Sequence, residues 1–122
     1  MNGNFLLDTN IVIALFEKDT NIIEKINVSE KIFIPSIVLG ELYYGAFNSS
    51  KKQSNIEKNN QFQKDANVLN CDASTGFFYG KIKKKLKLKG NPIPENDIWI
   101  AALALQNNLI LVSKDKHFKN IW

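Results

Sequence analysis

The spacing of short apolar segments limits the possible folds of this chain more than any other feature. These segments lie between longer stretches with helical character, at residues 4–7, 31–34, 67–69 and 109–112. Continuous apolar runs of this length are typical of strands that are buried on both faces of a parallel sheet. Strands that alternate with helices predict an α/β fold, with a mostly parallel sheet of four or five strands covered by helices on both faces.

The stretches between these strands predict helices at residues 11–18, 22–28, 36–48, 54–66 and 73–89, and a last helix that begins at Asn96 or Asp97. Ser36 is expected to be the N-cap of its helix. In the last helix we expect a narrow buried stripe formed by Ile98, Ala101, Ala102 and Leu105. Asn107-Asn108 predicts a left-handed exit from that helix. A chain of 122 residues predicts a single domain, residues 1–122.

Cysteine, histidine and hydropathy exclude several kinds of protein. Cys71 is the one cysteine and His117 the one histidine, so neither an internal disulfide nor a Cys/His zinc set is expected. No serine or cysteine stands in a recognisable nucleophile context to act with His117, so a catalytic triad is not expected. No apolar run approaches the ~20 residues of a membrane-spanning helix, and no signal-peptide pattern is present. We therefore expect a cytoplasmic protein.

The positive charge of the chain is uneven. All 16 basic residues are lysines, and the net charge is +4. Residues 51–89 hold ten lysines and three acids, whereas the rest of the chain holds six lysines and nine acids. This division is compatible with a protein that binds a phosphate backbone beside a cation-requiring site, and equally with a solvated lysine-rich surface.

Four acidic residues are placed where a parallel sheet would bring them to one edge. Asp8 and Asp115 follow predicted strands, Glu41 lies inside the helix after the second strand, and Asp97 stands at the start of the helix before the last strand. Ligand sites of open parallel sheets lie outside the carboxyl ends of the strands. If the first, second and fourth strands are neighbours, the four side chains converge. Each acid alone also has an ordinary structural explanation, as a helix cap, a surface residue or a turn residue.

Convergence of carboxylates favours a bound cation. Two carboxylates ~4 Å apart repel each other by roughly 4 kcal/mol at an effective dielectric constant of 20. Mg²⁺ or Mn²⁺, which prefer oxygen ligands, would relieve this repulsion. Such an ion lowers the pKa of its bound water and neutralises charge on a phosphoryl oxygen, so the pattern points to phosphodiester hydrolysis.

Four segments in order resemble the PIN-domain family, and in particular the VapC-type toxins of bacterial type II toxin–antitoxin pairs. The similarity covers about residues 5–118, and its segments are Leu7-Asp-Thr-Asn-Ile-Val12, Pro35-Ser-Ile-Val-Leu-Gly-Glu-Leu-Tyr-Tyr-Gly45, Ile93-Pro-Glu-Asn-Asp-Ile-Trp-Ile-Ala-Ala102 and Leu111-Val-Ser-Lys-Asp-Lys-His-Phe118. The resemblance implies a PIN-like three-layer sandwich, Mg²⁺-dependent cleavage of RNA (often transfer RNA) by metal-activated water, a homodimer, and inhibition by a cognate antitoxin.

The same resemblance implies roles for individual residues. Asp8 and Asp97 would be direct metal ligands, and Glu41 and Asp115 would complete the pocket directly or through water. Asn10 and Ser113 would make hydrogen bonds that orient the acids. Lysines would make the phosphate contacts, as point charges without the bidentate geometry of arginine; the candidates are Lys114, Lys116 and the tract 81–89.

This chain departs from the family pattern in two places. Ser113 stands where threonine is common, and it keeps the hydroxyl group. Many relatives continue past the position of Trp122 into a short edge strand, which leaves the fifth strand open here.

Several alternatives stay open from sequence. They are a PIN nuclease of general RNA processing without an antitoxin, a non-catalytic module that binds a cation, and, ranked low, a receiver-type phosphoacceptor domain. Aromatic residues are expected in the core or an interface rather than in a base-stacking platform; they are Trp99, Tyr43, Tyr44, Phe77 and Phe78. Tyr43, Tyr44 and Phe47 could form the dimer interface or equally belong to the core. The number of bound ions is also open.

Overall fold

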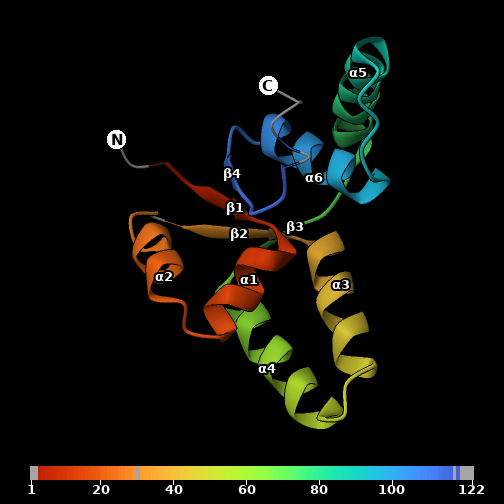
Figure 1. Ribbon diagram of the computed structural model, residues 1–122. Helices are drawn as coiled ribbons and strands as arrows, with labels where there is room; N and C mark the ends of the chain where they lie inside the picture. The colour runs from red at the N-terminus through yellow and green to blue at the C-terminus, as the bar shows by residue number, and fades with distance from the viewer. Residues whose placement is uncertain (1–2, 30, 117, 119–122) are drawn as a thin grey trace.

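The computed structural model describes residues 3–29, 31–116 and 118, and within these ranges strands and helices alternate as expected (Figure 1). The elements in chain order are β1 (Phe5–Leu7), α1 (Thr9–Phe16), α2 (Thr20–Ile26), β2 (Ile32–Pro35), α3 (Ser36–Phe47), α4 (Lys52–Asp65), β3 (Asn67–Leu69), α5 (Ala73–Lys89), α6 (Glu95–Gln106) and β4 (Ile110–Val112). The predicted α/β fold is confirmed. Residues 119–122, where a fifth strand would follow, and His117 lie outside the described ranges.

The sheet is parallel throughout, with strand order β3-β2-β1-β4. β1 therefore lies between β2 and β4. This is the strand order in which the four acids are expected to converge. Leu6 and Leu7 are completely buried, consistent with a strand that is covered on both faces. Figure 1 shows α1 to α4 on one side of the sheet and α5 and α6 on the other, so the sheet is the middle layer of three.

Helix α6 is more deeply buried than its sequence suggests. Six of its residues are buried, at Ile98 and 100–104, because the helix packs against both α5 and β4. Its alanines have small side chains and allow close approach of these neighbours. Leu105 is 42% exposed, so its place in the predicted stripe is wrong. Asn108 has a φ of 53°, which confirms the left-handed exit.

Five of the six predicted helix starts are wrong by one or two residues; α1, α2 and α4 each begin two residues earlier than expected. Ser36 is the first helical residue, and Pro35, the last residue of β2, occupies the N-cap without a side-chain hydrogen bond. The strand runs directly into the helix and leaves no separate capping residue. Likewise α6 begins at Glu95 with Pro94 as its N-cap, so Asp97 lies within the first turn. Acidic side chains are favourable there because the helix dipole is positive at its N-terminus.

The hairpin of α3 and α4 is held by polar as well as apolar contacts. Asn59 is buried on α4, and its Nδ2 donates a hydrogen bond to the carbonyl oxygen of Leu42 on α3 at 3.1 Å. Phe62 of α4 packs edge-to-face against Phe16 of α1, with ring centroids 5.4 Å apart.

Within the described ranges, none of the helices is both long and apolar enough to cross a bilayer.

Asn59 gives a direct test of how α4 is attached. We expect Asn59→Ala to lower the free energy of unfolding by about 1–3 kcal/mol, because a buried hydrogen bond to a main-chain carbonyl is lost. Urea denaturation followed by circular dichroism measures this change. Gln61→Ala, at an exposed position of the same helix, should change stability by less than about 0.5 kcal/mol. Equal effects of both substitutions would contradict this account of the attachment.

Candidate acidic site at the sheet edge

Asp8 is the buried centre of the site. It follows β1, is 5% exposed, and caps α1: its Oδ1 accepts a hydrogen bond from the Thr9 main-chain N–H at 2.8 Å. Its Oδ2 accepts a hydrogen bond from the Ser113 hydroxyl at 2.6 Å. Its own N–H donates to the carbonyl oxygen of Val112 at 3.1 Å, next to the pairing of Leu7 with Val112. Both carboxylate oxygens of Asp8 are therefore held in place.

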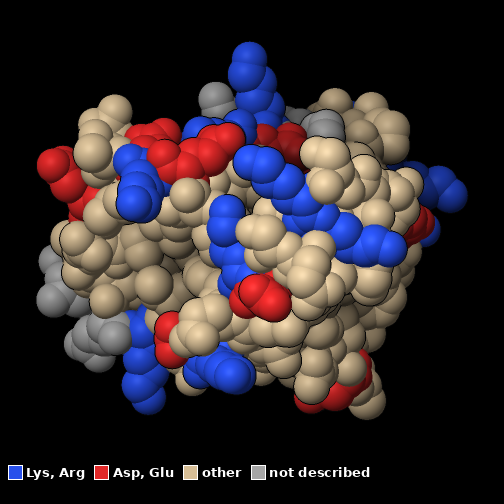
Figure 2. Space-filling model, turned by 90° about the horizontal axis from the view of Figure 1, so that it is seen from below, with Lys and Arg blue, Asp and Glu red and all other residues tan. Residues whose placement is uncertain are grey.

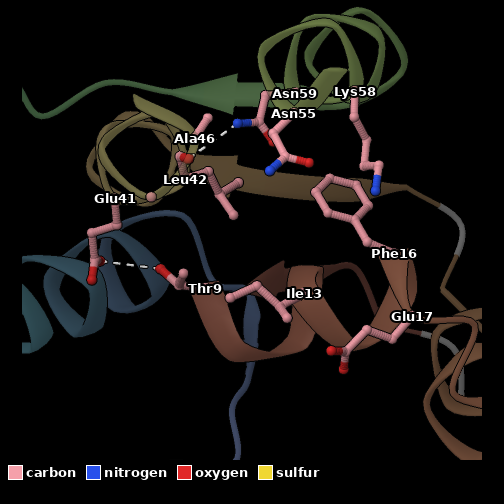
Figure 3. A pocket seen from close by; sticks show the side chains of 11 residues that line it. Thr9, Ile13, Phe16, Glu17, Glu41, Leu42, Ala46, Asn55, Lys58 and Asn59 are labelled. Carbon is pink, nitrogen blue, oxygen red and sulfur yellow. Dashed lines mark hydrogen bonds between the residues drawn. The ribbon is translucent and has the colours of Figure 1, made fainter. Parts of the chain in front are cut away.

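Glu41 reaches the site from the second turn of α3. The Thr9 hydroxyl donates a hydrogen bond to Glu41 Oε1 at 3.1 Å, as the dashed line in Figure 3 shows. Partial burial of the carboxylate raises the pKa of Glu41, and the charges of Asp8 and Asp97 raise it further, whereas the bond from Thr9 opposes the shift. Glu41 is thus near enough to Asp8 and to Asp97 for both charges to act on it. Thr9 is not among the site residues expected from the sequence, although it directly follows the first acid.

Asp97 and Asp115 are both partly buried. The N–H of Asp97 donates to the carbonyl oxygen of Pro94 at 3.1 Å, which places the residue in the first turn of α6. The N–H of Asp115 donates to the Ser113 hydroxyl oxygen at 2.9 Å. Ser113 therefore links Asp8 to the segment that carries Asp115.

Asn10 contributes to the same edge in a different way from Ser113. Its Oδ1 accepts a hydrogen bond from the main-chain N–H of Lys114 at 3.1 Å. This bond joins α1 to the segment after β4. Asn10 thus contacts the backbone beside the acids, while Ser113 contacts an acid directly.

A groove of about 350 Å³ begins at Thr9 and Glu41 and runs between α1, α3 and α4. Figure 3 shows the side chains of Ile13 and Phe16 on one wall and Leu42 on the other. The Nζ of Lys58 lies 5.5 Å from the centroid of the Phe16 ring. The acidic site thus opens into a partly apolar groove.

The donor chemistry of the site suits a hard divalent cation. Its side chains offer carboxylate oxygens, the ligands that Mg²⁺ and Mn²⁺ prefer. The one cysteine, Cys71, is exposed outside the site and adds no sulfur ligand to it. In the described part of the chain, neither Asp8 nor Glu41 has a lysine within ion-pair distance. Among the described residues, no group of three or more acidic, histidine or cysteine side chains lies close enough together to hold a metal ion. Coordination of one ion by three of these acids would therefore require their side chains to move closer together.

The lysines that sequence analysis proposed for phosphate contacts differ in their surroundings. Lys83, in the tract 81–89, is paired with Glu95 at 2.7 Å, so its charge is already compensated. The Nζ of Lys114 lies 3.9 Å from Oδ2 of Asp19, and about half of the Lys114 side chain is exposed. Lys116 is also exposed. Figure 2 shows lysine and acidic side chains mixed on the face that is seen from below, so this face is not uniformly basic.

The aromatic residues divide into packed and exposed groups. The rings of Tyr79 and Trp99 are stacked with centroids 4.1 Å apart. Tyr44 is 71% and Phe47 58% exposed, so neither belongs to the core. Of the two locations considered from sequence for Tyr44 and Phe47, an interface is the one compatible with this exposure.

Comparison with known proteins agrees with this architecture. The sequence model of the PIN domain family matches residues 5–121. Ribonuclease VapC2 of Rickettsia felis is 36% identical and covers 96% of this chain and 91% of its own length. The tRNA(fMet)-specific endonuclease VapC of Shigella flexneri is 34% identical and covers 91% of this chain and 86% of its own length.

A solved structure shows the same fold. The crystal structure of DNA-bound VapBC from Salmonella typhimurium contains a chain with a TM-score of 0.88 and 31% identity; the alignment covers 97% of this chain and 92% of that chain. The family match spans almost the whole sequence. The chain therefore belongs to the PIN domain family and is homologous to the VapC proteins.

Proposed function

We propose that this protein is a metal-dependent endoribonuclease that hydrolyses phosphodiester bonds of RNA and acts as the toxin of a toxin–antitoxin pair. The observation that carries the proposal is the position of Glu41 at the sheet edge, close enough to Asp8 and Asp97 for their charges to act on it, without a lysine paired to Asp8 or Glu41 in the described part of the chain. Repulsion of this kind is relieved by a divalent cation. The relatives include a ribonuclease and a tRNA(fMet)-specific endonuclease, which supports the choice of RNA, and of tRNA in particular.

The roles proposed for the acids follow the resemblance to the PIN domain family. Asp8, which is buried and hydrogen-bonded at both oxygens, and Asp97 at the start of α6 are proposed as direct ligands of Mg²⁺ or Mn²⁺. Glu41 and Asp115 would complete the site directly or through water. When bound, the ion would activate water and stabilise negative charge on the phosphoryl oxygens.

The other residues of the edge prepare this arrangement. Ser113 holds Asp8 in one orientation through its 2.6 Å hydrogen bond, and Asn10 holds the segment that leads to Asp115. Lys114 and Lys116, on either side of Asp115, are proposed to contact the RNA phosphates. Pre-orientation of the carboxylates lowers the cost of ordering them when the substrate arrives.

The proposed partner is a cognate antitoxin, and the proposed compartment is the cytoplasm. Structures similar to this chain include VapBC from Salmonella typhimurium and VapBC2 from Rickettsia felis bound to a promoter DNA fragment. We also propose a homodimer, for which the exposed Tyr44 and Phe47 on α3 offer apolar surface. A PIN nuclease without an antitoxin and a non-catalytic cation-binding module are the competing functions.

The first prediction concerns catalysis. Purified protein should cleave RNA only with Mg²⁺ or Mn²⁺, and Asp8→Asn or Asp97→Asn should each lower the cleavage rate at least about 100-fold, because each substitution removes a charged ligand. Gel analysis of labelled tRNA in the presence of metal or EDTA measures this rate. Glu57→Gln, an exposed acid on α4, is the matched control and should cleave at the wild-type rate.

Two results would count against the catalytic proposal. Cleavage that persists in EDTA would exclude the metal-dependent mechanism. Full metal binding without cleavage of any RNA would instead favour the non-catalytic module.

The second prediction concerns charge repulsion in the metal-free protein. The pKa of Glu41 is raised from its ordinary value of 4.5, so ionised Glu41 destabilises the fold above its raised pKa, and this penalty is lost as the pH falls through that pKa. Glu41→Gln should therefore raise the melting temperature at pH 7 in EDTA. The gain should stay below about 1 kcal/mol, because Glu41 is solvent-exposed and its charge is screened.

Differential scanning calorimetry over a pH series measures this effect. The gain from Glu41→Gln should shrink as the pH falls toward 4.5 and be absent below it. A gain that stays constant from pH 7 to pH 4 would exclude ionisation of Glu41 as its cause.

The third prediction tests the toxin assignment. Induced expression of the wild-type protein in a bacterial host should arrest growth, whereas Asp8→Asn should not. Co-expression of the protein encoded by the neighbouring reading frame should restore growth and form a complex with this chain that co-purifies. Cleavage of RNA in vitro without growth arrest would favour the general RNA-processing nuclease.

A further inference from the structure

Thr9 makes hydrogen bonds to two of the four acids at once. Its main-chain N–H donates to Asp8 Oδ1 at 2.8 Å, and its hydroxyl donates to Glu41 Oε1 at 3.1 Å. The first bond belongs to the cap of α1 and is available to any residue except proline at this position. The second bond joins α1 to α3 and depends on the side chain.

The position of Glu41 depends on this second bond. Figure 3 shows the long side chain of Glu41 next to Thr9 at one end of the groove, and Glu41 is exposed to solvent. The charges of Asp8 and Asp97 push its carboxylate away from the site. In the described part of the chain, Thr9 is the residue whose side chain holds that carboxylate by a hydrogen bond, and no lysine lies within ion-pair distance of it. A donor that carries no charge keeps Glu41 near Asp8 without neutralising it.

A second threonine in the chain separates this role from ordinary helix capping. Thr20 occupies the same position in α2, as the first helical residue after the capping residue Asp19. Asp19 makes its capping hydrogen bonds to the N–H groups of Asn21 and Ile22, and Thr20 is exposed on the surface. A helix of this chain thus begins with the same Asp-Thr pair without a bond from the threonine hydroxyl to a distant acid.

We propose that Thr9 is a positioning residue whose hydroxyl holds Glu41 beside Asp8, so that the two carboxylates together bind the divalent cation. This inference rests on the proposed function, because it assigns a purpose to the cation site. It implies that α1 supplies the link between the acid that follows β1 and the acid that lies on α3.

The experiment measures Mn²⁺ binding to RNA-free protein by isothermal titration calorimetry. Thr9→Val keeps the shape of the side chain and removes the hydroxyl; it should weaken Mn²⁺ binding on the order of tenfold. Thr9→Ser keeps the hydroxyl, so its Mn²⁺ affinity should stay within about twofold of the wild-type affinity. Loss of an orienting hydrogen bond would cause a larger change. Thr20→Val is the matched control and should bind Mn²⁺ as the wild type does. Thr9→Ala replaces Thr9→Val if the valine variant does not fold.

A double-substitution cycle shows whether Thr9 acts through Glu41. In protein that already carries Glu41→Gln, adding Thr9→Val should not weaken Mn²⁺ binding further, because the carboxylate that Thr9 positions is no longer present. A wild-type affinity in Thr9→Val, or an equal loss in the presence and absence of Glu41, would overturn the inference. If the wild type binds Mn²⁺ and cleaves RNA, either of these results leaves the proposed function intact. If the wild type binds no Mn²⁺, the proposed function fails, and the inference fails with it.

Discussion

The parallel pairing of β1 with β4 is the constraint on which the acidic site depends. Because Leu7 pairs with Val112, the first residue after β1 lies beside the first residue after β4, and Asp8 meets Ser113 at 2.6 Å. A shift of one residue in this register would turn each side chain to the other face of the sheet and separate the two. The burial of Leu6 and Leu7 on both faces of the sheet makes such a shift costly. The apolar core thus fixes the geometry of a polar site at its edge.

From this pairing, hydrogen bonds extend across the edge in both directions. Thr9 joins Asp8 to Glu41 on α3, and Ser113 joins Asp8 to the main chain of Asp115. Each link is a short polar group on an element that the core already holds. Partial burial of the Glu41 carboxylate, and repulsion from the charges of Asp8 and Asp97, act against these links and raise the pKa of Glu41. The site therefore combines a firmly positioned central acid with neighbouring acids whose charges oppose one another, and a bound cation would relieve this opposition.

Much of the fold was predictable from the pattern of residues. The four strands were located to within one residue at each end, because buried parallel strands are continuous apolar runs bounded by polar residues. Helix termini were less predictable: at Pro35 and Pro94 the chain enters a helix without a capping side chain. Leu105 was assigned to the core from its spacing, yet the packing of α6 between α5 and β4 buries other faces of the helix and leaves Leu105 exposed.

For the site, the sequence by itself determined which chemistry is available: four carboxylates that follow strands or begin and line helices, lysine as the one basic residue type, and an ordered set of segments that resemble the PIN domain family. The tertiary structure decided which groups meet. Glu41 contacts Thr9 although the two lie 32 residues apart, and Asn10 binds the main chain of Lys114 instead of an acid. Such contacts depend on strand order, register and helix packing, which arise from interactions between distant residues. Local spacing identifies the acids, but only the folded chain determines which neighbours hold them.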